Sequence, residues 1–353
     1  MIECQAGLSL GQHLIKRKGD SMPSVTFEEH LGIKLQERTR KPRKTGLTMV
    51  IDRCEPWQYQ QGYLDAYADY IDVVKLTEPH LIQPLPVVQQ KVDQLRRYGV
   101  TPQPGGIIIE IARAQGQGLD VLRKLREMGF EQIEVSSSAN TQREIEEEAA
   151  YVQSAKGLGF KVIGEVGKKF PEGDTSRKSD EVIDVGETVR QMKSLLAAGC
   201  SYVYWEGHLT RRLIGEHPAE IIAKESTGTR QLLEVVQAVG VDNIIFEVSS
   251  IIPAKTRRAM QFWFVRLFGP NVNIGNARID EINTIEATRL GTHPIFGFGP
   301  AGDHPWIHST LDHGGSASPT WWKEYPTYPS PIAGEGSPEL PTERRRTIHS
   351  TGR

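Results

Sequence analysis

Short runs of β-branched and other apolar residues alternate with longer amphipathic runs along most of the chain. From Gly46 onward eight short runs can be counted, each bounded by polar or turn-forming residues. The runs between them have helical spacing, as in 84–99, 118–129 and 141–159, and often end at a glycine. We expect the short runs to be strands, at 47–52, 70–75, 106–111, 132–137, 161–166, 201–206, 243–248 and 271–275.

This alternation predicts the α/β class. Strands that alternate with helices pair in parallel and are joined by right-handed crossovers. Eight such units over roughly 245 residues match a single (β/α)8 barrel of the TIM type, although an open, doubly wound sheet would show the same alternation. We therefore divide the chain into an N-terminal extension (1–45), a (β/α)8 barrel domain (46–299) and a C-terminal tail (300–353).

The two segments outside the barrel differ in composition. The tail is rich in Pro, Gly, Ser, Thr and His without an apolar period, so we expect low order there. The extension ends in a basic run, which is typical of nucleic-acid binding or nuclear targeting, but a solvated approach to the first strand explains it more simply. The members of this run are Lys34, Arg38, Arg40, Lys41, Arg43 and Lys44.

Composition argues against several classes of function. The formal net charge is −2, so no general attraction to nucleic acid or to an anionic membrane is expected. The chain has no run of about 18 apolar residues and its N-terminus lacks a signal-peptide pattern. Three widely separated cysteines, Cys4, Cys54 and Cys200, fit neither a disulfide framework nor a zinc cluster. We expect a cytoplasmic protein.

Charged residues stand at the carboxyl ends of the expected strands, where a barrel gathers its active-site side chains. A carboxylate is costly to bury in an apolar strand unless it is paired or coordinates a metal. Oxygen ligands of this kind suit Mg²⁺. A ring of ion pairs that merely fills the barrel mouth is the alternative. The candidate metal ligands are Asp52, Glu110, Glu134, Glu165, Glu206 and Glu247.

Three basic residues, Arg53, Lys75 and Lys168, are candidate catalytic groups. A lysine that is desolvated beside a bound cation can have a lowered pKa, and could then donate or remove a proton near neutral pH. Lys168 and Lys169 follow the fifth expected strand, next to a turn at Gly167. Lys169 is a candidate for contact with an anionic substrate.

The last two strands are followed by residues that could hold an anion. Gly275 and Asn276 lie where the chain turns from the eighth strand toward the last helix, and backbone amides at such turns commonly bind phosphate. Ser249 and Ser250 follow the seventh strand, and basic residues such as Arg257 could add further donors. An ordinary charged helix start explains this second group equally well.

The strand-end motifs together resemble one enzyme family. In order they are GLTMVID (46–52), DYIDVVK (69–75), PGG (104–106), FEQIEVS (130–136), EVGKK (165–169), YWEG (204–207), IIFE (244–247) and NVNIGN (271–276). In this order they resemble phosphosulfolactate synthase of coenzyme M biosynthesis and its relatives, which include plant heat-stress-associated proteins. EVGKK is the most specific motif.

The resemblance implies a (β/α)8 barrel, a homo-oligomer such as a trimer, and an enzyme that uses Mg²⁺ to add sulfite to the methylene carbon of phosphoenolpyruvate. A cation would stabilise charge on the substrate carboxylate, and a lysine would protonate the adjacent carbon. Lys168 matches the family lysine proposed as that acid. The loops after the second, fourth and sixth strands depart from the family pattern. A related nucleophile, a different anionic substrate and a non-catalytic, stress-associated barrel are therefore alternatives.

Overall fold

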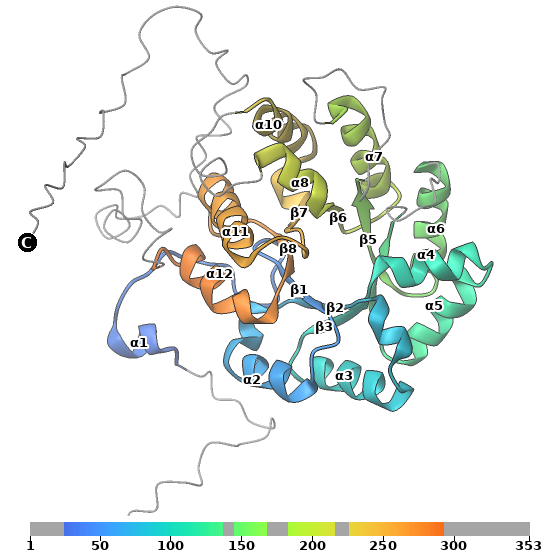
Figure 1. The fold of residues 1–353 in the computed structure, drawn as a ribbon, viewed down its shortest axis with the longest axis horizontal. Coiled ribbons are helices and arrows are strands. Elements are labelled where there is room, and N and C mark those ends of the chain that lie inside the picture. Colours follow the sequence, from blue (N-terminus) through green and yellow to red (C-terminus); the bar gives the residue numbers. More distant parts are fainter. Residues whose placement is uncertain (1–24, 137–144, 168–182, 216–225, 293–353) are drawn as a thin grey trace, which may run out of the picture.

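The computed structural model describes residues 25–136, 145–167, 183–215 and 226–292 (Figure 1). In this part of the chain eight parallel strands form one sheet, in the order β3-β2-β1-β8-β7-β6-β5-β4, which curves into a barrel. The predicted single (β/α)8 barrel is confirmed. The strands are β1 (Thr48–Asp52), β2 (Val73–Leu76), β3 (Thr101–Pro104), β4 (Gln132–Val135), β5 (Lys161–Val166), β6 (Tyr202–Trp205), β7 (Ile244–Glu247) and β8 (Ile274–Ala277).

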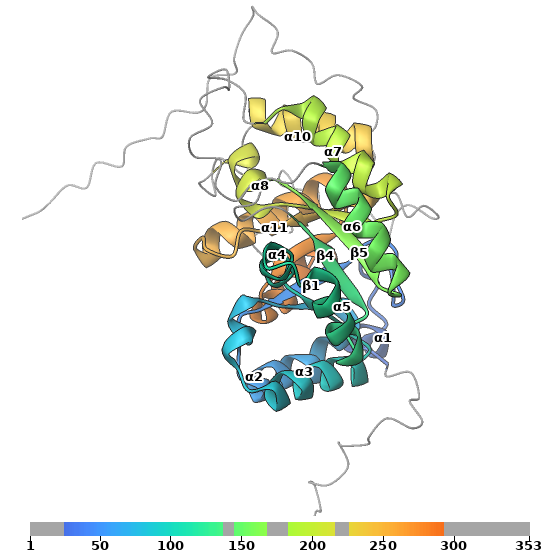
Figure 2. The same cartoon turned by 90° about the vertical axis from the view of Figure 1, so that its right-hand side faces the viewer.

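Helices cover the outside of the sheet (Figures 1 and 2). Among the helices of the described residues, none combines the length and hydropathy that crossing a bilayer requires. The helices are α1 (Phe27–Leu31), α2 (Trp57–Tyr67), α3 (Leu85–Arg97), α4 (Gly106–Ala114), α5 (Gly118–Glu127), α6 (Ile145–Gly157), α7 (Val185–Ala197), α8 (Gly207–Ile214), α10 (Thr227–Val239), α11 (Ala254–Phe268) and α12 (Ile282–Arg289), with 3-10 turns η1 (Ala68–Tyr70), η2 (Glu78–Ile82), η3 (Val241–Asn243) and η4 (Ile279–Glu281).

The third predicted strand is wrong. Residues 106–111 form the start of helix α4, and β3 lies earlier, at Thr101–Pro104. The three consecutive isoleucines at 107–109 have high β-propensity, which favoured a strand. The true strand reads Thr-Pro-Gln-Pro, and prolines within a run argue against a strand because proline lacks a backbone donor.

Prolines are tolerated in β3 because only one side of this strand pairs through the backbone. The amides of Thr101 and Gly105 donate to carbonyls of residues 72 and 76, on the β2 side. Alternate residues of a strand direct their amides to opposite neighbours, so Pro102 and Pro104 stand where donors toward β4 would be. Accordingly, β3 and β4 are the two ends of the strand order. The barrel therefore has a seam between them.

The strands are buried on both faces, as is usual for a parallel barrel. One hydrophobic cluster lies between strands and helices, and a smaller one fills the barrel interior. Two residues further along four of these strands, on the same inward face, the side chains become charged. The interior apolar residues Val73, Ile163, Tyr204 and Ile245 are followed in this way by Lys75, Glu165, Glu206 and Glu247.

The basic run before β1 is not simply a solvated approach. The Arg38 side chain is only 4% exposed and forms an ion pair with Glu286 of α12. The Arg43 side chain is 2% exposed, and its Nη1 lies 3.1 Å from an oxygen of Asp72. These two arginines fasten the segment to the amino end of the barrel, so the expectation for them is corrected.

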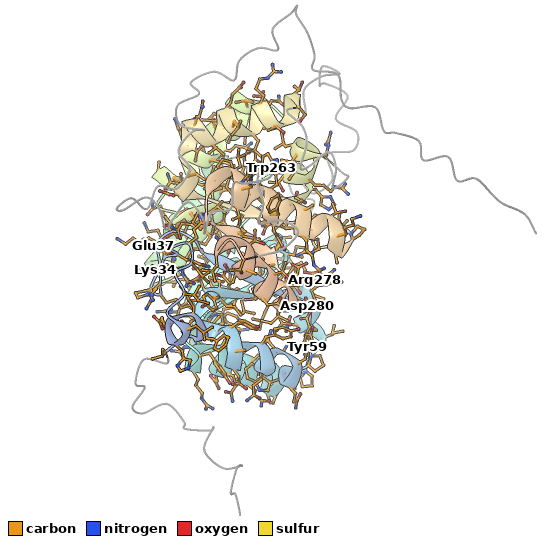
Figure 3. The ribbon with its side chains drawn as sticks, turned by 90° about the vertical axis from the view of Figure 1, so that its left-hand side faces the viewer. Lys34, Glu37, Tyr59, Trp263, Arg278 and Asp280 are labelled. Atoms are coloured by element: carbon orange, nitrogen blue, oxygen red, sulfur yellow. The ribbon has the colours of Figure 1, made fainter. Side chains whose placement is uncertain are left out.

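Different segments of the chain therefore lie at the two ends of the barrel. In Figure 3, Lys34 and Glu37 of the segment before β1 lie on the opposite side of the barrel from Arg278 and Asp280, which follow β8. The carboxyl ends of the strands are therefore the end that carries the candidate site. The predicted tail (300–353) lies outside the described residues.

We expect Arg38→Met to lower the free energy of unfolding by about 3 kcal/mol, because it leaves the buried Glu286 carboxylate without this partner. Arg40→Ala is the matched control, since Arg40 is 85% exposed in its pair with Glu29 and should change stability by less than about 1 kcal/mol. Urea unfolding followed by circular dichroism measures both. Equal effects of the two variants would contradict the buried position of Arg38.

Candidate functional site

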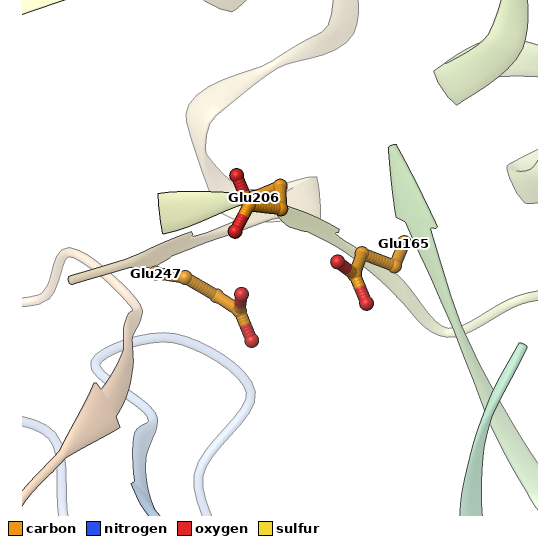
Figure 4. Close-up of side chains that lie close together, drawn as sticks. All are labelled: Glu165, Glu206 and Glu247. Carbon is orange, nitrogen blue, oxygen red and sulfur yellow. The ribbon is translucent and has the colours of Figure 1, made fainter. Parts of the chain in front are cut away.

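Three glutamates converge at the carboxyl end of the barrel (Figure 4). Glu165 lies one residue before the end of β5, Glu206 directly follows β6, and Glu247 ends β7. Parallel pairing of these three adjacent strands brings the side chains together. All three are buried, and one carboxylate oxygen of each lies within 4.8 Å of those of the others. We call these residues the three-glutamate cluster. Its oxygens are ligands of the type that Mg²⁺ prefers.

Glu206 is held in position by the start of α8. Its Oε2 accepts hydrogen bonds from the backbone N–H groups of His208, at 2.7 Å, and Leu209, at 3.3 Å. This is an N-cap, which helix N-termini favour because their first N–H groups lack helical partners. Gly207 must be glycine, because a Cβ there would lie 2.7 Å from the backbone N of Ser249. The YWEG motif therefore fixes both the carboxylate and the approach of α8 to the β7 loop.

Lys75 lies between two carboxylates inside the barrel. Its Nζ donates to Glu134 Oε2 at 3.0 Å and to Glu247 Oε1 at 2.8 Å. Burial alone would lower the pKa of Lys75, but the two glutamates outweigh it and hold the pKa well above its ordinary value. The lowered pKa was predicted for a lysine beside a bound cation, so the catalytic role of Lys75 stays a prediction. Between its two carboxylates this lysine is held in its charged form.

A buried network of neutral side chains joins Glu134 to the rest of the barrel. Gln103 Nε2 donates to Glu134 Oε2 at 3.2 Å, while Gln103 Oε1 accepts from Gln132 Nε2 at 2.6 Å and from Tyr204 Oη at 2.9 Å. These bonds bridge the seam between β3 and β4. Gly106 makes room for Glu134, because a Cβ there would lie 2.1 Å from its Oε1. Sequence reasoning missed the glutamines, although amides in short buried strands are a usable signal.

Asp52 serves the turn after β1. Its Oδ2 lies 2.7 Å from Nζ of Lys91 on α3 and 3.4 Å from Nε2 of His80. Its Oδ1 accepts the backbone N–H groups of Cys54, at 2.9 Å, and Glu55, at 3.1 Å. The side chain thus points to the surrounding helices and is not part of the three-glutamate cluster. Its predicted metal-binding role stays a prediction that these contacts do not favour.

We expect Asp52→Asn to destabilise the protein by about 3 kcal/mol at neutral pH, because Lys91 would lose its buried partner. Burial raises the pKa of Asp52, but the His80 hydrogen bond and the Lys91 charge outweigh it and hold the pKa well below its usual range. A depressed pKa contributes stability above the unfolded value of about 3.9 that is lost as the pH falls below it. Urea unfolding at several pH values should therefore show that the parent and Asp52→Asn differ less in free energy of unfolding in acid. A difference that does not change with pH would contradict a charged Asp52 paired with Lys91.

Two other predicted residues lie apart from the cluster. Glu110 is in helix α4, not at a strand end, and its Oε1 accepts from Ser136 Oγ at 2.5 Å. This correction follows from the helical conformation of 106–111. The Arg53 side chain is exposed, and the next residue, Cys54, has φ of +70°, a conformation that non-glycine residues rarely adopt. The metal role of Glu110 and the catalytic role of Arg53 stay predictions.

The residues predicted to bind an anion lie together at the ends of β7 and β8. These strands pair directly, with Glu247 opposite Gly275. Ser249 Oγ and Asn276 Oδ1 are buried without a hydrogen-bond partner among the described residues. Asn276 also has φ of +53°, in the left-handed region that asparagine adopts more readily than most residues with a side chain. Ser250 lies next to Ser249 and is partly buried. The anion-binding role of these four residues stays a prediction.

The predicted lysines after β5 fall outside the described residues. Lys168 and Lys169 follow Gly167, the last described residue of that segment. Their place in the sequence puts them directly after the strand that carries Glu165. Their roles stay predictions.

The chain is similar to named enzymes over most of its length. Residues 36–294 match the family described as (2R)-phospho-3-sulfolactate synthase. The phosphosulfolactate synthase of Methanothermobacter thermautotrophicus is 30% identical over 255 residues, covering 72% of this chain and 92% of that protein. The enzyme of Methanocaldococcus jannaschii is 30% identical over 247 residues, covering 70% and 91%. That of Bacillus subtilis is 28% identical over 269 residues, covering 73% and 95%. The strand-end motifs and these matches agree, and the chain belongs to the phosphosulfolactate synthase family of enzymes.

Proposed function

We propose that the protein catalyses the Mg²⁺-dependent addition of sulfite to phosphoenolpyruvate, giving 2-phospho-3-sulfolactate. Membership of the phosphosulfolactate synthase family supports the reaction class. The observation that carries the metal requirement is the convergence of three buried carboxylates within 4.8 Å at the carboxyl end of the barrel. The proposal therefore places the substrate over this end.

The donor set of the three-glutamate cluster fits Mg²⁺. Carboxylate oxygens are the hard ligands that this ion takes, usually together with water and substrate oxygens. Together with Glu134, the cluster carries four formal negative charges, and Lys75 supplies one positive charge. A divalent cation held by Glu165, Glu206 and Glu247 would offset much of the remainder. When bound, it would stabilise negative charge on the substrate carboxylate.

The chain's own residues would then handle the electron and proton movements. The sulfur lone pair of sulfite forms a bond to the methylene carbon of phosphoenolpyruvate. The electron pair of the carbon–carbon double bond moves onto the carboxylate, giving an enolate, and returns as the central carbon takes a proton. We assign that proton to Lys168, on the family resemblance of EVGKK. Lys75, which stays protonated, would lower the energy of the nearby negative charge.

The phosphate group would lie at the ends of β7 and β8. Ser249 Oγ is a buried hydroxyl without a partner among the described residues, and Ser250 adjoins it. Gly275 and Asn276 lie in the facing strand, β8. Lys169 would add a positive charge from the β5 side. Phosphate bound after strands seven and eight is a recurring arrangement in (β/α)8 enzymes.

We also propose that the protein is a cytoplasmic homo-oligomer, with the trimer as the first candidate. Both proposals come from the family resemblance and the sequence composition. Light scattering of the eluted protein measures the mass, which should be about three times the mass of one chain, 39.4 kDa.

A continuous assay tests the proposed reaction. Purified protein, Mg²⁺ and phosphoenolpyruvate are mixed with sulfite or another small nucleophile, and loss of the enol double bond is followed by ultraviolet absorbance. We expect loss with sulfite and none after a chelator removes Mg²⁺. Loss only with another nucleophile would assign a different substrate. No loss with any nucleophile would overturn the enzymatic assignment of this site.

A further inference from the structure

Arg257, in the first turn of α11, is one of the most deeply buried charged residues, with 0% exposure. Its Nε and Nη2 contact the two carboxylate oxygens of Glu281, at 2.7 and 2.8 Å. Its Nη1 donates to the carbonyls of Val248, at 3.2 Å, and Ser249, and its Nη2 also donates to the carbonyl of Asn276, at 2.6 Å. All five guanidinium N–H donors are therefore used within the chain. Arg257 has no donor left for a substrate, which corrects the idea that it binds the anion.

The contacts of Arg257 connect the loop after β7 to the end of β8. Val248 and Ser249 follow β7, whereas Asn276 lies in β8, and one guanidinium holds carbonyls from both. A planar guanidinium in a bidentate pair has a fixed orientation, unlike the flexible ammonium of lysine. The relative position of the two strand ends is therefore set by the orientation of one side chain.

Glu281 fixes that orientation from η4. Besides Arg257, its Oε2 accepts from Gln261 Nε2 at 2.8 Å and from the backbone N–H of Arg278 at 3.0 Å. Burial would raise the pKa of Glu281, but the hydrogen bond and charge of Arg257 outweigh it and lower the pKa. The carboxylate is thus held charged opposite the guanidinium. The pair of Arg257 and Glu281 therefore links α11 to η4.

The contacts of Arg257 leave other polar groups of the two strand ends available to a ligand. Because a trans peptide directs its C=O and N–H to opposite sides, carbonyls that point to Arg257 turn the N–H groups of Ser249 and Ser250 away from it. Ser249 Oγ and Asn276 Oδ1 are buried without a partner among the described residues, and Asn276 is held at a φ of +53°. Buried polar atoms without a partner in the chain are the kind of arrangement that a ligand completes.

We propose that Arg257 is a positioning residue: held by Glu281, it sets the loop after β7 against the end of β8 so that Ser249, Ser250 and Asn276 receive the phosphate group of the substrate. It acts without touching that group. The inference rests on the proposed function, in which this end of the barrel binds the phosphate.

The structure offers a matched control in Arg289 of α12. Arg289 is also 0% exposed, and its Nη1 also donates to two main-chain carbonyls, those of Pro270 and Val272, at 2.5 and 2.7 Å. These carbonyls precede β8, at the amino end of the barrel, whereas Arg257 serves the carboxyl end. Arg257→Lys and Arg289→Lys therefore make the same chemical change at the same burial on opposite ends.

Binding is measured by titration calorimetry with phosphoenolpyruvate and, separately, with Mg²⁺ alone. For Arg257→Lys we expect the phosphoenolpyruvate dissociation constant to rise at least about tenfold, with Mg²⁺ affinity within about twofold of the parent. Arg289→Lys should lower the melting temperature and keep the parent's affinity for phosphoenolpyruvate. Unchanged affinity in Arg257→Lys, or an equal loss in both variants, would overturn the positioning role.

A second variant and a second ligand cover the cases in which Arg257→Lys does not fold or the parent does not bind phosphoenolpyruvate. If Arg257→Lys does not fold, Glu281→Gln removes the charge that orients Arg257 and must show the same selective loss. If the parent does not bind phosphoenolpyruvate, the proposed substrate is wrong, and the titrations are repeated with inorganic phosphate to test the positioning role alone. A parent that binds neither would overturn both proposals. Binding by the parent with selective loss in Arg257→Lys supports the inference whatever the nucleophile is.

Discussion

Glu165→Gln is expected to lower kcat/KM by about a hundredfold to a thousandfold, and to abolish the stabilisation of the protein by Mg²⁺. Its carboxylate is one of three within 4.8 Å of one another, so the change removes a charged ligand from the cluster. Loss of charge stabilisation worth several kcal/mol in the transition state gives a rate effect of this size. The measurements are steady-state kinetics with phosphoenolpyruvate and sulfite, and thermal melting with and without Mg²⁺.

Thermal melting separates metal binding from a structural role of Glu165. A ligand at about 100 times its dissociation constant stabilises the folded state by about 2.7 kcal/mol, so the parent should melt higher in Mg²⁺. Glu148→Gln is the control, because Glu148 is also buried but pairs with Arg113 outside the barrel. It should melt lower than the parent yet keep the full Mg²⁺ response. A normal Mg²⁺ response in Glu165→Gln would remove this residue from the metal site.

Lys75→Met is expected to be the most destabilising of the substitutions considered, by about 3–5 kcal/mol or more at neutral pH, because the buried carboxylates of Glu134 and Glu247 both lose their cation. The pKa of Lys75 is raised, so its contribution is fully present below the ordinary lysine pKa of about 10.4 and is lost only at higher pH. In the variant, acid should protonate the two glutamates and restore stability. Unfolding by urea at neutral pH and near pH 5 measures the recovery.

Lys91→Met is the matched control for that pH dependence. Lys91 is also buried, but its partner Asp52 accepts two backbone N–H groups as well, which keep the carboxylate charged after the lysine is lost. The free energy of unfolding that is regained in mild acid should therefore be larger for Lys75→Met than for Lys91→Met. Equal recovery, or a Lys75→Met protein as stable as the parent, would show that Glu134 and Glu247 are not a charged pair around Lys75.

The sequence predicted the barrel well because its helices and strands have different periods. Seven of the eight expected strands overlap the observed strands in the right order. The exception, β3, has two prolines that are harmless because the strand does not pair with β4 through its backbone. Pairing between strands far apart in sequence is a tertiary property, so local propensity could not reveal it.

The same limit explains which candidate ligands come together. In a parallel barrel both faces of a strand are buried, so hydrophobic alternation does not distinguish inward from outward positions. Glu165, Glu206 and Glu247 point inward, whereas Asp52, equally conspicuous in the sequence, points to Lys91 in the helical layer. Glu110 was assigned to a strand end only because the isoleucine run resembles a strand.

The residues that hold the site residues in place were the hardest to predict from the sequence. Gln103 and Tyr204 come from strands distant in sequence, and their hydrogen bond has meaning only after the barrel closes. Arg257 was recognised as a basic residue near the β7 loop and as a possible donor to an anion. Because it is buried, we infer that it supports the site and does not bind the anion. A charged residue in sequence gives no information on whether its charge faces a substrate or the chain itself.

The most direct test of the proposed function is identification of the product. Phosphoenolpyruvate, ¹³C-labelled at the methylene carbon, is incubated with sulfite, Mg²⁺ and either the parent protein or Lys168→Ala, and followed by phosphorus and carbon NMR. We predict that the parent forms a phosphate ester whose labelled carbon carries sulfur, and that Lys168→Ala forms little or none. Phosphoenolpyruvate left unchanged by the parent would contradict the proposed reaction, and equal product from both proteins would contradict the role of Lys168.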